Sequence, residues 1–349
     1  KWILNLSMNN NPWRSTSVRS ALEGRSFIDA KRIHIHSEQE ALEYLSCYGF
    51  DLNDPMDVKE LEDLRIEALE LIQDELLLEN EFIPQAIVDV KDVTWYLLNA
   101  SGDGDKALMP WSAAVLRVIH TLTHSYSHLN DIYHDIIREQ IFSRFEDHIV
   151  RQKDGCFFGK IKLVDVELRT AKSRRSVAMK LLHKAENVAA DIFDWIGIRF
   201  ITKYRSDVLD VLAYLREKHI VTYANLKPSR SRNTLIDLNW VNQCFDRKMS
   251  IDEMRKEMQP MEYPSFNKAP VQNQFSEASY HSVQITCRQR IKIKQPDGQK
   301  FCFYFPFEIQ MMDHYSFNKT RKGLASHSEY KERQRKAVRS RVLPFLQKS

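Results

Sequence analysis

The segment DIFDWIGIRF, residues 191–200, constrains the fold more than any other part of the sequence. Its apolar side chains are typical of a buried β-strand, yet Asp194 stands at its start and Arg199 lies inside it. A charge buried without a partner is costly. The segment therefore predicts a strand whose charged residues have dedicated partners. These are either ion-pair and capping partners within the protein or, for Asp194, a metal ion at the edge of a sheet.

The pattern of the remaining chain places this strand in an α+β domain. Residues 37–150 have apolar positions at helical spacing, with a loop at 101–105. From residue 151 on, alternating segments predict strand, helix, strand, helix, two paired strands and a helix, with a polar insertion at about 225–278. We therefore predict an all-helical N-terminal domain, 1–150, followed by an α+β domain, 151–349, whose mixed β-sheet is flanked by helices.

Charge is distributed unevenly along the chain. The 349 residues carry a formal net charge of only +4, but residues 37–90 hold sixteen acidic and two basic side chains, and residues 319–341 hold nine basic and two acidic ones. This asymmetry predicts that the C-terminal half meets an anion such as a phosphate. It also predicts that the acidic helical segment docks against the basic half, in a regulatory or neutralising role. The alternative is two solvated helix faces.

Cysteines and hydropathy indicate the compartment. Five scattered cysteines without a CxxC pair argue against a zinc site and a disulfide framework, and they fit a reducing environment. No apolar run in the sequence is long enough to span a membrane. We therefore predict a cytoplasmic protein that does not interact with membranes.

The segment RTAKSRRSVAMK concentrates positive charge where a strand is predicted to end and a helix to begin. Helix N-termini favour anions, and guanidinium and ammonium groups together suit a triphosphate. We therefore predict phosphate binding here, a solvated basic turn being the alternative. The residues concerned are Arg169, Lys172, Arg174, Arg175, Ser176 and Lys180.

Two acidic residues on predicted strands form the second candidate site. Glu308 lies between Phe307 and Ile309, on the opposite face of its strand to both. On neighbouring strands, Asp194 and Glu308 could share one Mg²⁺, because this ion takes few protein oxygens and completes its shell with phosphates. The alternative is that each carboxylate pairs with an arginine such as Arg199.

Histidines offer a weaker signal. His120, His124 and His128 are spaced by four and share one helix face, as metal ligands can. No carboxylate or cysteine lies near them at a spacing typical of metal ligands, so a packed or polar helix face is the preferred interpretation. The dipeptide His134-Asp135 is of the kind that metal phosphohydrolases use, but one such pair is weak evidence for hydrolysis.

From about residue 164 to 331 the chain resembles the synthetase domain of the RelA/SpoT family, which transfers pyrophosphate from ATP to the 3′-hydroxyl of a guanine nucleotide. The resemblance rests on four motifs in the family's order. They are an arginine, a lysine and a Ser-x-x-x-Lys turn; DWIGIR, followed by SDV; FEIQ; and ASHSEYK. Arg169 lies one residue further out than the family's arginine.

The acceptor half of the motif set departs from the family. The family's strand G-Y-x-S-x-H is SYHSVQ here, with Ser279 for the glycine and Gln284 for the histidine. Met312 stands where an arginine usually follows E-I-Q. The basic K-D-Y stretch that normally precedes the acceptor strand is not recognisable, and neither is the usual hydrolase domain in residues 1–150.

The resemblance implies a nucleotidyltransferase-like synthetase domain and a Mg²⁺-dependent pyrophosphokinase. It implies that Asp194 and Glu308 hold Mg²⁺, that Glu308 helps to deprotonate the attacking hydroxyl, and that Arg169 and Arg205 sandwich the adenine of ATP. The residues implied in acceptor binding are Tyr280, whose ring would stack on a base, Ser282, Gln284, Gln310 and His327.

The altered acceptor half leaves three alternatives open. The acceptor is GDP or GTP, as the resemblance implies, or an adenine nucleotide or the 3′ end of an RNA such as tRNA. A rival of another class is a non-catalytic nucleotide sensor or interaction module on the same fold. The presence of Asp194, Glu308 and Lys180 together favours an enzyme. A homo-oligomer is compatible with the sequence but not indicated by it.

Overall fold

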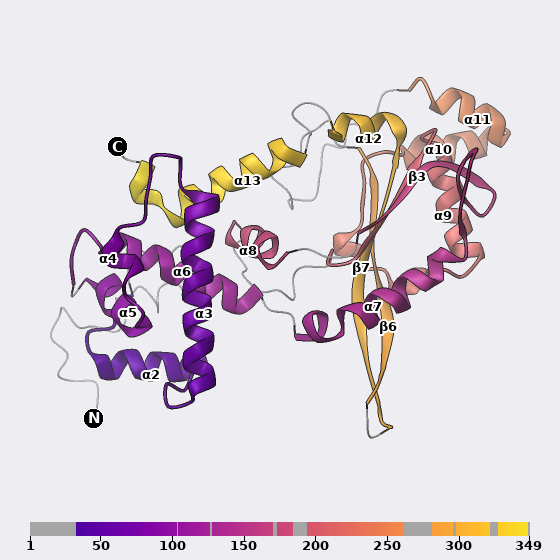
Figure 1. Cartoon of the computed structure of the whole chain (residues 1–349). Coiled ribbons are helices and arrows are strands. Elements are labelled where there is room, and N and C mark those ends of the chain that lie inside the picture. The colour runs from indigo at the N-terminus through magenta and orange to yellow at the C-terminus, as the bar shows by residue number, and fades with distance from the viewer. Residues whose placement is uncertain are drawn as a thin grey trace, which may run out of the picture. The chain divides into compact units, whose positions relative to one another are not determined.

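Two compact units of interleaved segments make up the chain (Figure 1). Unit 1 consists of Lys1–Ser127, Ser173–Asp191 and Glu332–Ser349, and unit 2 of His128–Lys172 and Ile192–Lys331. The predicted boundary at residue 150 therefore falls inside unit 2. The computed structural model describes residues 33–102, 104–125, 128–169, 173–183, 194–261, 281–295, 298–321 and 327–347.

The elements described in unit 1 are helices. Local sequence explains where several of them begin: the side chains of Ser37, Asp54 and Asp92 each accept a hydrogen bond from a backbone N–H of the first turn that follows. A π-helical turn, η4, continues α3 without a break. The elements are α2 (Glu38–Tyr48), α3 (Pro55–Leu71), η4 (Ile72–Leu76), α4 (Gln85–Val88), α5 (Val93–Ser101), α6 (Met109–Ser125), α8 (Arg174–Leu182), most of α13 (His327–Val342) and η9 (Pro344–Gln347).

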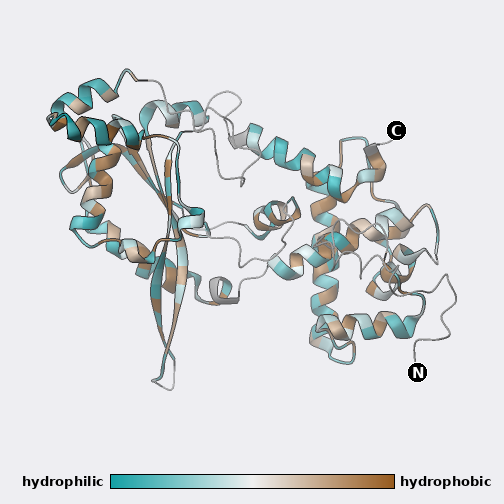
Figure 2. Cartoon of the chain, turned by 180° about the vertical axis from the view of Figure 1, so that it is seen from behind, coloured by the Kyte–Doolittle hydropathy of each residue, from teal (hydrophilic) through white to brown (hydrophobic). Residues whose placement is uncertain are grey.

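The core of unit 1 joins parts of the chain that are far apart in sequence. Leu64 and Leu122 of the N-terminal helices share one apolar cluster with Leu182 of α8 and with Val338 and Val342 of α13. Most of the remaining surface of α13 is hydrophilic, as its teal colour in Figure 2 shows. Helix α13 is thus anchored by a few apolar side chains and presents its basic residues around them.

Unit 2 is built on a seven-stranded mixed sheet with the order β1-β2-β3-β4-β7-β6-β5. Strands β4 and β7 are parallel, and every other neighbouring pair is antiparallel. The α+β class and the two paired C-terminal strands are as predicted. The strands are β1 (Ile149–Gln152), β2 (Gly155–Phe158), β3 (Ile161–Arg169), β4 (Gly197–Thr202), β5 (Arg232–Asn233), β6 (Val283–Lys294) and β7 (Lys300–Asp313).

Helices α7 (His128–Glu146) and α9 (Asp207–Glu217) pack on the apolar face of this sheet. The ring of Phe145 from α7 lies 6.4 Å from that of Phe200 on β4, and Phe158 lies 4.7 Å from Phe200 and 4.9 Å from Tyr214 of α9. These aromatic contacts account for the alternation in β4, because every second side chain of that strand joins this core.

The described part of the predicted insertion, residues 225–261, forms short elements. Helices α10 (Leu238–Asp246) and α11 (Ile251–Met258) begin at the caps Asp237 and Ser250, and β5 adds an edge strand to β6. At α9, Ser206 occupies the N-cap position as predicted, but its side chain makes no capping bond. Asp207 instead accepts a hydrogen bond from the N–H of Tyr204.

All elements described between residues 38 and 146 are helical. An all-helical domain ending at residue 150 nevertheless stays a prediction, because α7 belongs to unit 2 while α8 and most of α13 belong to unit 1. Within the described ranges, no helix has both the length and the apolar character needed to cross a membrane.

Candidate functional site

One face of the unit 2 sheet carries a row of polar side chains in register across five strands. Glu167, Arg199, Gln310, Gln284 and Arg232 are successive Cα partners on β3, β4, β7, β6 and β5. Register partners on neighbouring strands place their side chains on the same face. The row therefore lies opposite the aromatic core that α7 and α9 cover.

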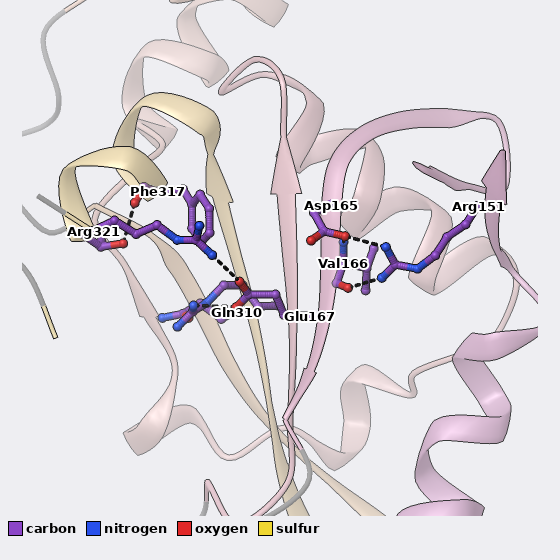
Figure 3. Close-up of polar contacts among 9 residues, drawn as sticks. Arg151, Asp165, Val166, Glu167, Gln310, Phe317 and Arg321 are labelled. Carbon is purple, nitrogen blue, oxygen red and sulfur yellow. Dashed lines mark hydrogen bonds and ion pairs between the residues drawn. The ribbon is translucent and has the colours of Figure 1, made fainter. Parts of the chain in front are cut away.

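Arg199 is held by its two neighbours in this row. Its Nε donates to Gln310 Oε1 at 2.6 Å, and a terminal nitrogen donates to Glu167 Oε2 at 2.8 Å. The other oxygen of Glu167 pairs at 3.4 Å with Arg321 of α12 (His314–Arg321), as Figure 3 shows. Arg199 thus has the carboxylate partner that the ion-pair hypothesis predicts. Gln310, predicted to bind the acceptor, is 3% exposed and orients this arginine.

A second row lies two residues away on the same face, at the start of β4. It consists of Arg169, Gly197, Glu308 and Thr286, again in register. A Cβ built on Gly197 would lie 3.7 Å from Cδ of Arg169 and 3.6 Å from the backbone oxygen of Glu308. Gly197 itself is buried, and the side chain of the exposed Arg169 packs close to it, beside the half-buried Glu308.

Asp194 stands three residues before Gly197 and is half-buried. The backbone N–H of Glu308 donates to the carbonyl of Ile196 at 2.9 Å, which extends the β4–β7 ladder toward Asp194. Both carboxylates therefore belong to the same end of β4, and both have polar interactions within the protein.

Two carboxylates at one strand end are a donor set that suits Mg²⁺ when phosphates supply the other ligands. Among the described residues, no group of three or more histidine, cysteine, aspartate or glutamate side chains is arranged to hold a metal ion. A cation held by Asp194 and Glu308 would therefore require ligands from a bound nucleotide. Asp194 and Glu308 therefore suit Mg²⁺ if a bound nucleotide completes its coordination shell.

The β5–β6 edge of the polar face contains two unsatisfied buried atoms. Nε of Arg232 and Oγ of Ser282 are buried and lack a hydrogen-bond partner within the described part of the chain. Arg232 is the register partner of Gln284, and Ser282 lies two residues before Gln284. Buried polar groups are nearly always paired, so two unsatisfied polar atoms on the same face, two positions apart in the strand register, indicate a place for a polar ligand or water.

The basic residues of α8 lie in unit 1 and are engaged there. Arg174 pairs with Glu67 at 3.0 Å, and Arg175 pairs with Asp74 at 2.8 Å. The N-terminus of the helix is capped by Ser173, whose side chain accepts from the N–H of Ser176. The predicted phosphate-binding residues are therefore divided: Arg169 belongs to unit 2, whereas Arg174, Arg175, Ser176 and Lys180 belong to unit 1.

The remaining predicted residues have varied positions. Arg205 is only 4% exposed, and its guanidinium donates to the backbone oxygens of Met258, the last residue of α11, and of Met261, three residues further on. Lys172 and Tyr280 lie outside the described residues, and for His327 only its place at the start of α13 is described. The adenine-sandwich role of Arg205 stays a prediction.

His120 and His124 of α6 form a cluster with Tyr48 of α2. The Tyr48 hydroxyl contacts Nδ1 of His120 and lies 3.2 Å from Nε2 of His124. Burial, and secondarily the neighbouring His124, lowers the pKa of His120 to about 4, and burial also raises the pKa of Tyr48 above its ordinary value. This arrangement agrees with the packed helix face preferred from the sequence.

From the sequence alone, Glu167 and Arg321 have no predicted role, and Arg232 is predicted only as one of several basic residues of the insertion that could contact the acceptor. Glu167 could have been found from the alternation in KLVDVELR, because it shares a face with Arg169. Arg232 and Arg321 come from segments without a strand pattern that identifies their neighbours. Their position depends on the pairing of a two-residue strand and on the packing of α12.

Three solved structures are similar to this chain over more than half its length. The small alarmone synthetase 2 of Bacillus subtilis has 14% identity and a TM-score of 0.30, with 62% of this chain and 96% of that one covered. A GTP pyrophosphokinase family protein of Streptococcus pneumoniae has 14% identity, a TM-score of 0.25 and coverage of 66% and 87%. The protein smu.1046c of Streptococcus mutans UA159 has 16% identity, a TM-score of 0.24 and coverage of 68% and 91%.

No protein-family model matches the chain, and no curated protein matches it. Likenesses with TM-scores this low establish neither a family nor an activity. The function therefore has to be argued from the residues themselves.

Proposed function

We propose that the chain is a Mg²⁺-dependent pyrophosphokinase that transfers pyrophosphate from ATP to the 3′-hydroxyl of a nucleotide. The observation that carries the proposal is the start of β4. There, Asp194 and Glu308 belong to one end of the strand, and Arg169 and Glu308 lie in register on either side of Gly197. The motifs DWIGIR and FEIQ, on which the resemblance to the synthetase family rests, supply these residues.

In the proposed reaction, the acceptor's 3′-oxygen forms a bond to the β-phosphorus of ATP, and the bond between that phosphorus and the oxygen on the α-phosphate breaks. AMP leaves. Asp194 and Glu308 would hold Mg²⁺, which offsets charge on the phosphates. A Glu308 oxygen accepts the hydroxyl proton, and the planar guanidinium of exposed Arg169 stacks on adenine above Gly197.

Arg199 has a positioning role in this scheme. It lies one row from Arg169 and Glu308, and its bonds to Glu167 on β3 and Gln310 on β7 hold its side chain in place between these strands. Because a misplacement of about 1 Å can cost two orders of magnitude in rate, a rigid row below the reacting atoms favours transfer.

The acceptor is expected at the β5–β6 edge. Arg232 lies in register with Gln284, the position at which the family has a histidine, so the insertion brings a cation to the strand that lost one. The unsatisfied Nε of Arg232 and Oγ of Ser282 would donate to the acceptor's phosphate or ribose oxygens. GDP or GTP, an adenine nucleotide and an RNA 3′ end all offer such oxygens.

A non-catalytic nucleotide sensor is the second candidate. It is favoured by the ion pairs of Arg174 and Arg175 with Glu67 and Asp74, because arginines already neutralised within unit 1 are less available to ATP phosphates. In that case the chain would bind ATP and Mg²⁺ without turnover.

One experiment separates the two candidates. The chain is incubated with γ-labelled ATP, Mg²⁺ and a panel of GDP, GTP, ADP, ATP and tRNA, and the labelled product and released AMP are identified. Equimolar AMP and labelled acceptor, both lost in Glu308→Gln, are the expected result. If calorimetry shows that ATP binds but no AMP is released with any acceptor of the panel, the chain is the nucleotide sensor. Labelled inorganic phosphate with ADP would contradict pyrophosphate transfer.

A further inference from the structure

The hairpin of β6 and β7 continues well past the rest of the sheet (Figure 1). Strand β4 pairs with β7 only from Glu308 to Asp313, and β5 pairs with β6 only at Val283 and Gln284. Beyond these contacts the hairpin is a two-stranded ribbon, with partners from Gln289↔Phe305 to Lys294↔Lys300. A bare two-stranded ribbon is marginally stable in water, so one of its faces has to be packed.

Helix α7 packs against one face of this ribbon. The Gln140 side chain donates to the backbone oxygen of Lys292 at 2.8 Å and accepts from its N–H at 3.0 Å. The ring of Tyr133 lies 6.4 Å from those of Phe301 and Phe303, and Ile291 is fully buried. The residues of β6 on the covered face are therefore Gln289, Ile291 and Ile293.

The opposite face of the ribbon is basic and exposed. Its β6 positions are Arg288, Arg290, Lys292 and Lys294, all four exposed. Their register partners on β7 are Pro306, Tyr304, Cys302 and Lys300, so this face carries no acidic side chain. Among the described residues, no ion pair joins the four cations to a carboxylate. We call these four residues the hairpin cations.

Tyr304 stands among the hairpin cations. It is the register partner of Arg290, and 57% of it is exposed. Charges that only protect a sheet edge from further pairing do not require an exposed ring among them. A row of cations with an aromatic side chain is instead the combination that binds single-stranded nucleic acid, because the cations follow the phosphates and the ring stacks on a base.

The geometry suits an extended strand. Alternate residues of a β-strand lie about 6.6 Å apart, which is similar to the separation of successive phosphates in an extended nucleic acid. The face also continues, through Thr286 and Glu308, into the second polar row of the sheet. We propose that the hairpin cations and Tyr304 bind the backbone and one base of single-stranded RNA or DNA.

The test measures the binding of fluorescent twelve-nucleotide oligo(rU) and oligo(dT) by anisotropy across a salt series, with the full chain. Replacing the four hairpin cations with glutamine should weaken binding at least tenfold. It should also make the slope of log K against log salt shallower by about 3, since each phosphate contact in a single strand contributes about 0.7. The matched control removes four other exposed cations of unit 2: Lys153, Lys160, Lys203 and Lys218.

Tyr304 gives a second, independent readout. Tyr304→Ala should weaken binding about 5- to 150-fold, and Tyr304→Phe should retain most of it, because stacking needs the ring and not the hydroxyl. Equal loss in the control quadruple variant, no loss in the hairpin quadruple variant, or equal affinity of Tyr304→Ala and Tyr304→Phe would overturn the proposal. So would equally tight, equally cation-dependent binding of vesicles containing anionic phospholipid. Preference for oligo(rU) or for oligo(dT) identifies the nucleic acid.

This inference stands apart from the proposed enzyme activity. Glu308→Gln should bind the oligonucleotides as the unmodified chain does, and the hairpin quadruple variant should still release AMP with a mononucleotide acceptor. In the unmodified chain, oligonucleotide binding without AMP release for any acceptor would contradict only the proposed function. AMP release without oligonucleotide binding would contradict only the proposed surface.

Discussion

Two basic regions of the molecule, helices α8 and α13 in unit 1 and the β6–β7 hairpin in unit 2, use arginine and lysine in different ways. In unit 1 the basic residues of α8 and α13 pair with acidic residues of α3, η4 and the loop after it: Arg174 with Glu67, Arg175 with Asp74, Arg335 with Glu75 and Arg339 with Glu81. In unit 2 the hairpin cations face solvent. The difference teaches that a cluster of basic residues in this sequence has two meanings: internal pairing with the acidic segment in unit 1, and an open surface at the hairpin of unit 2, although Arg199 of unit 2 is also paired internally.

The internal pairs also refine the docking hypothesis. The acidic segment does contact basic residues from the C-terminal half of the sequence, but these residues belong to the same compact unit as the acids. The contact is thus part of the packing of unit 1. Whether it regulates an activity stays a prediction.

The largest expected effect separates chemistry from stability in unit 2. Glu308→Gln and Asp194→Asn should each lower AMP release about 10³-fold or more, because each removes a proposed Mg²⁺ ligand. The melting temperature should change by no more than about 3 °C. Rates are compared with those of Asp154→Asn, an exposed control in the β1–β2 turn. Activity within tenfold of the unmodified chain in either variant would remove that carboxylate from the proposed site.

A second effect concerns His120 of unit 1. Burial lowers its pKa to about 4 in the folded chain, whereas the unfolded chain has the ordinary value near 6.5. Between these values the unfolded state binds more protons, so the free energy of unfolding falls as pH falls from about 6.5 to about 4. The decrease in the free energy of unfolding that His120 causes should reach about 2 to 3 kcal/mol. This decrease should be absent in His120→Gln.

Chemical denaturation at several pH values measures this effect, with His36→Gln as an exposed control. Such a control should leave the slope unchanged. An unaltered pH dependence in His120→Gln would show that other groups produce the acid sensitivity.

The third expected effect tests the internal pairs of unit 1. Arg339 donates two hydrogen bonds to Glu81, at 2.6 and 2.7 Å, and these bonds are the main reason that the pKa of Glu81 is lowered. Arg339→Ala should lower the free energy of unfolding by about 2 kcal/mol, since the pair is mostly buried. Lys336→Ala, on an exposed part of the same helix, should cost less than about 0.5 kcal/mol. Equal losses would mean that helix propensity, not the pair, is measured.

The smallest expected effect sharpens the same contrast. The quadruple glutamine variant of the hairpin cations should change the free energy of unfolding by no more than about 0.5 kcal/mol, because exposed residues without ion pairs contribute little to stability. Urea denaturation provides the measurement. A loss comparable to that of Arg339→Ala would assign the hairpin cations a structural role and weaken the contrast between the units.

Much of unit 2 could be predicted because its signals are local. The alternation in FEIQMM places Glu308 and Gln310 on one face, and the charge inside DWIGIR predicts a partner for Arg199. The partner itself, Glu167, depends on which strand lies beside β4, and this is a long-range property of the sheet. The position of Arg232 beside Gln284 could not be predicted for the same reason, since a two-residue strand has no periodicity to detect.

Unit 1 was harder to predict because its boundaries are not set by composition. Helix α8 has the basic surface of a phosphate-binding turn, but Met179 and Leu182 pack with the N-terminal helices. In unit 2, the burial of Arg205 could not be predicted either, because its hydrogen bonds go to backbone oxygens that no side-chain pattern reveals.

The place of α13 has a consequence for how the chain reaches its native state during synthesis. Val338, Val342 and Leu343 complete an apolar cluster whose other members lie mostly in the first 122 residues. The ribosome must therefore release all of unit 2 before the N-terminal helices can bury their last surface. Until then these helices expose apolar surface, and a chaperone that covers it would be needed until α13 has been made.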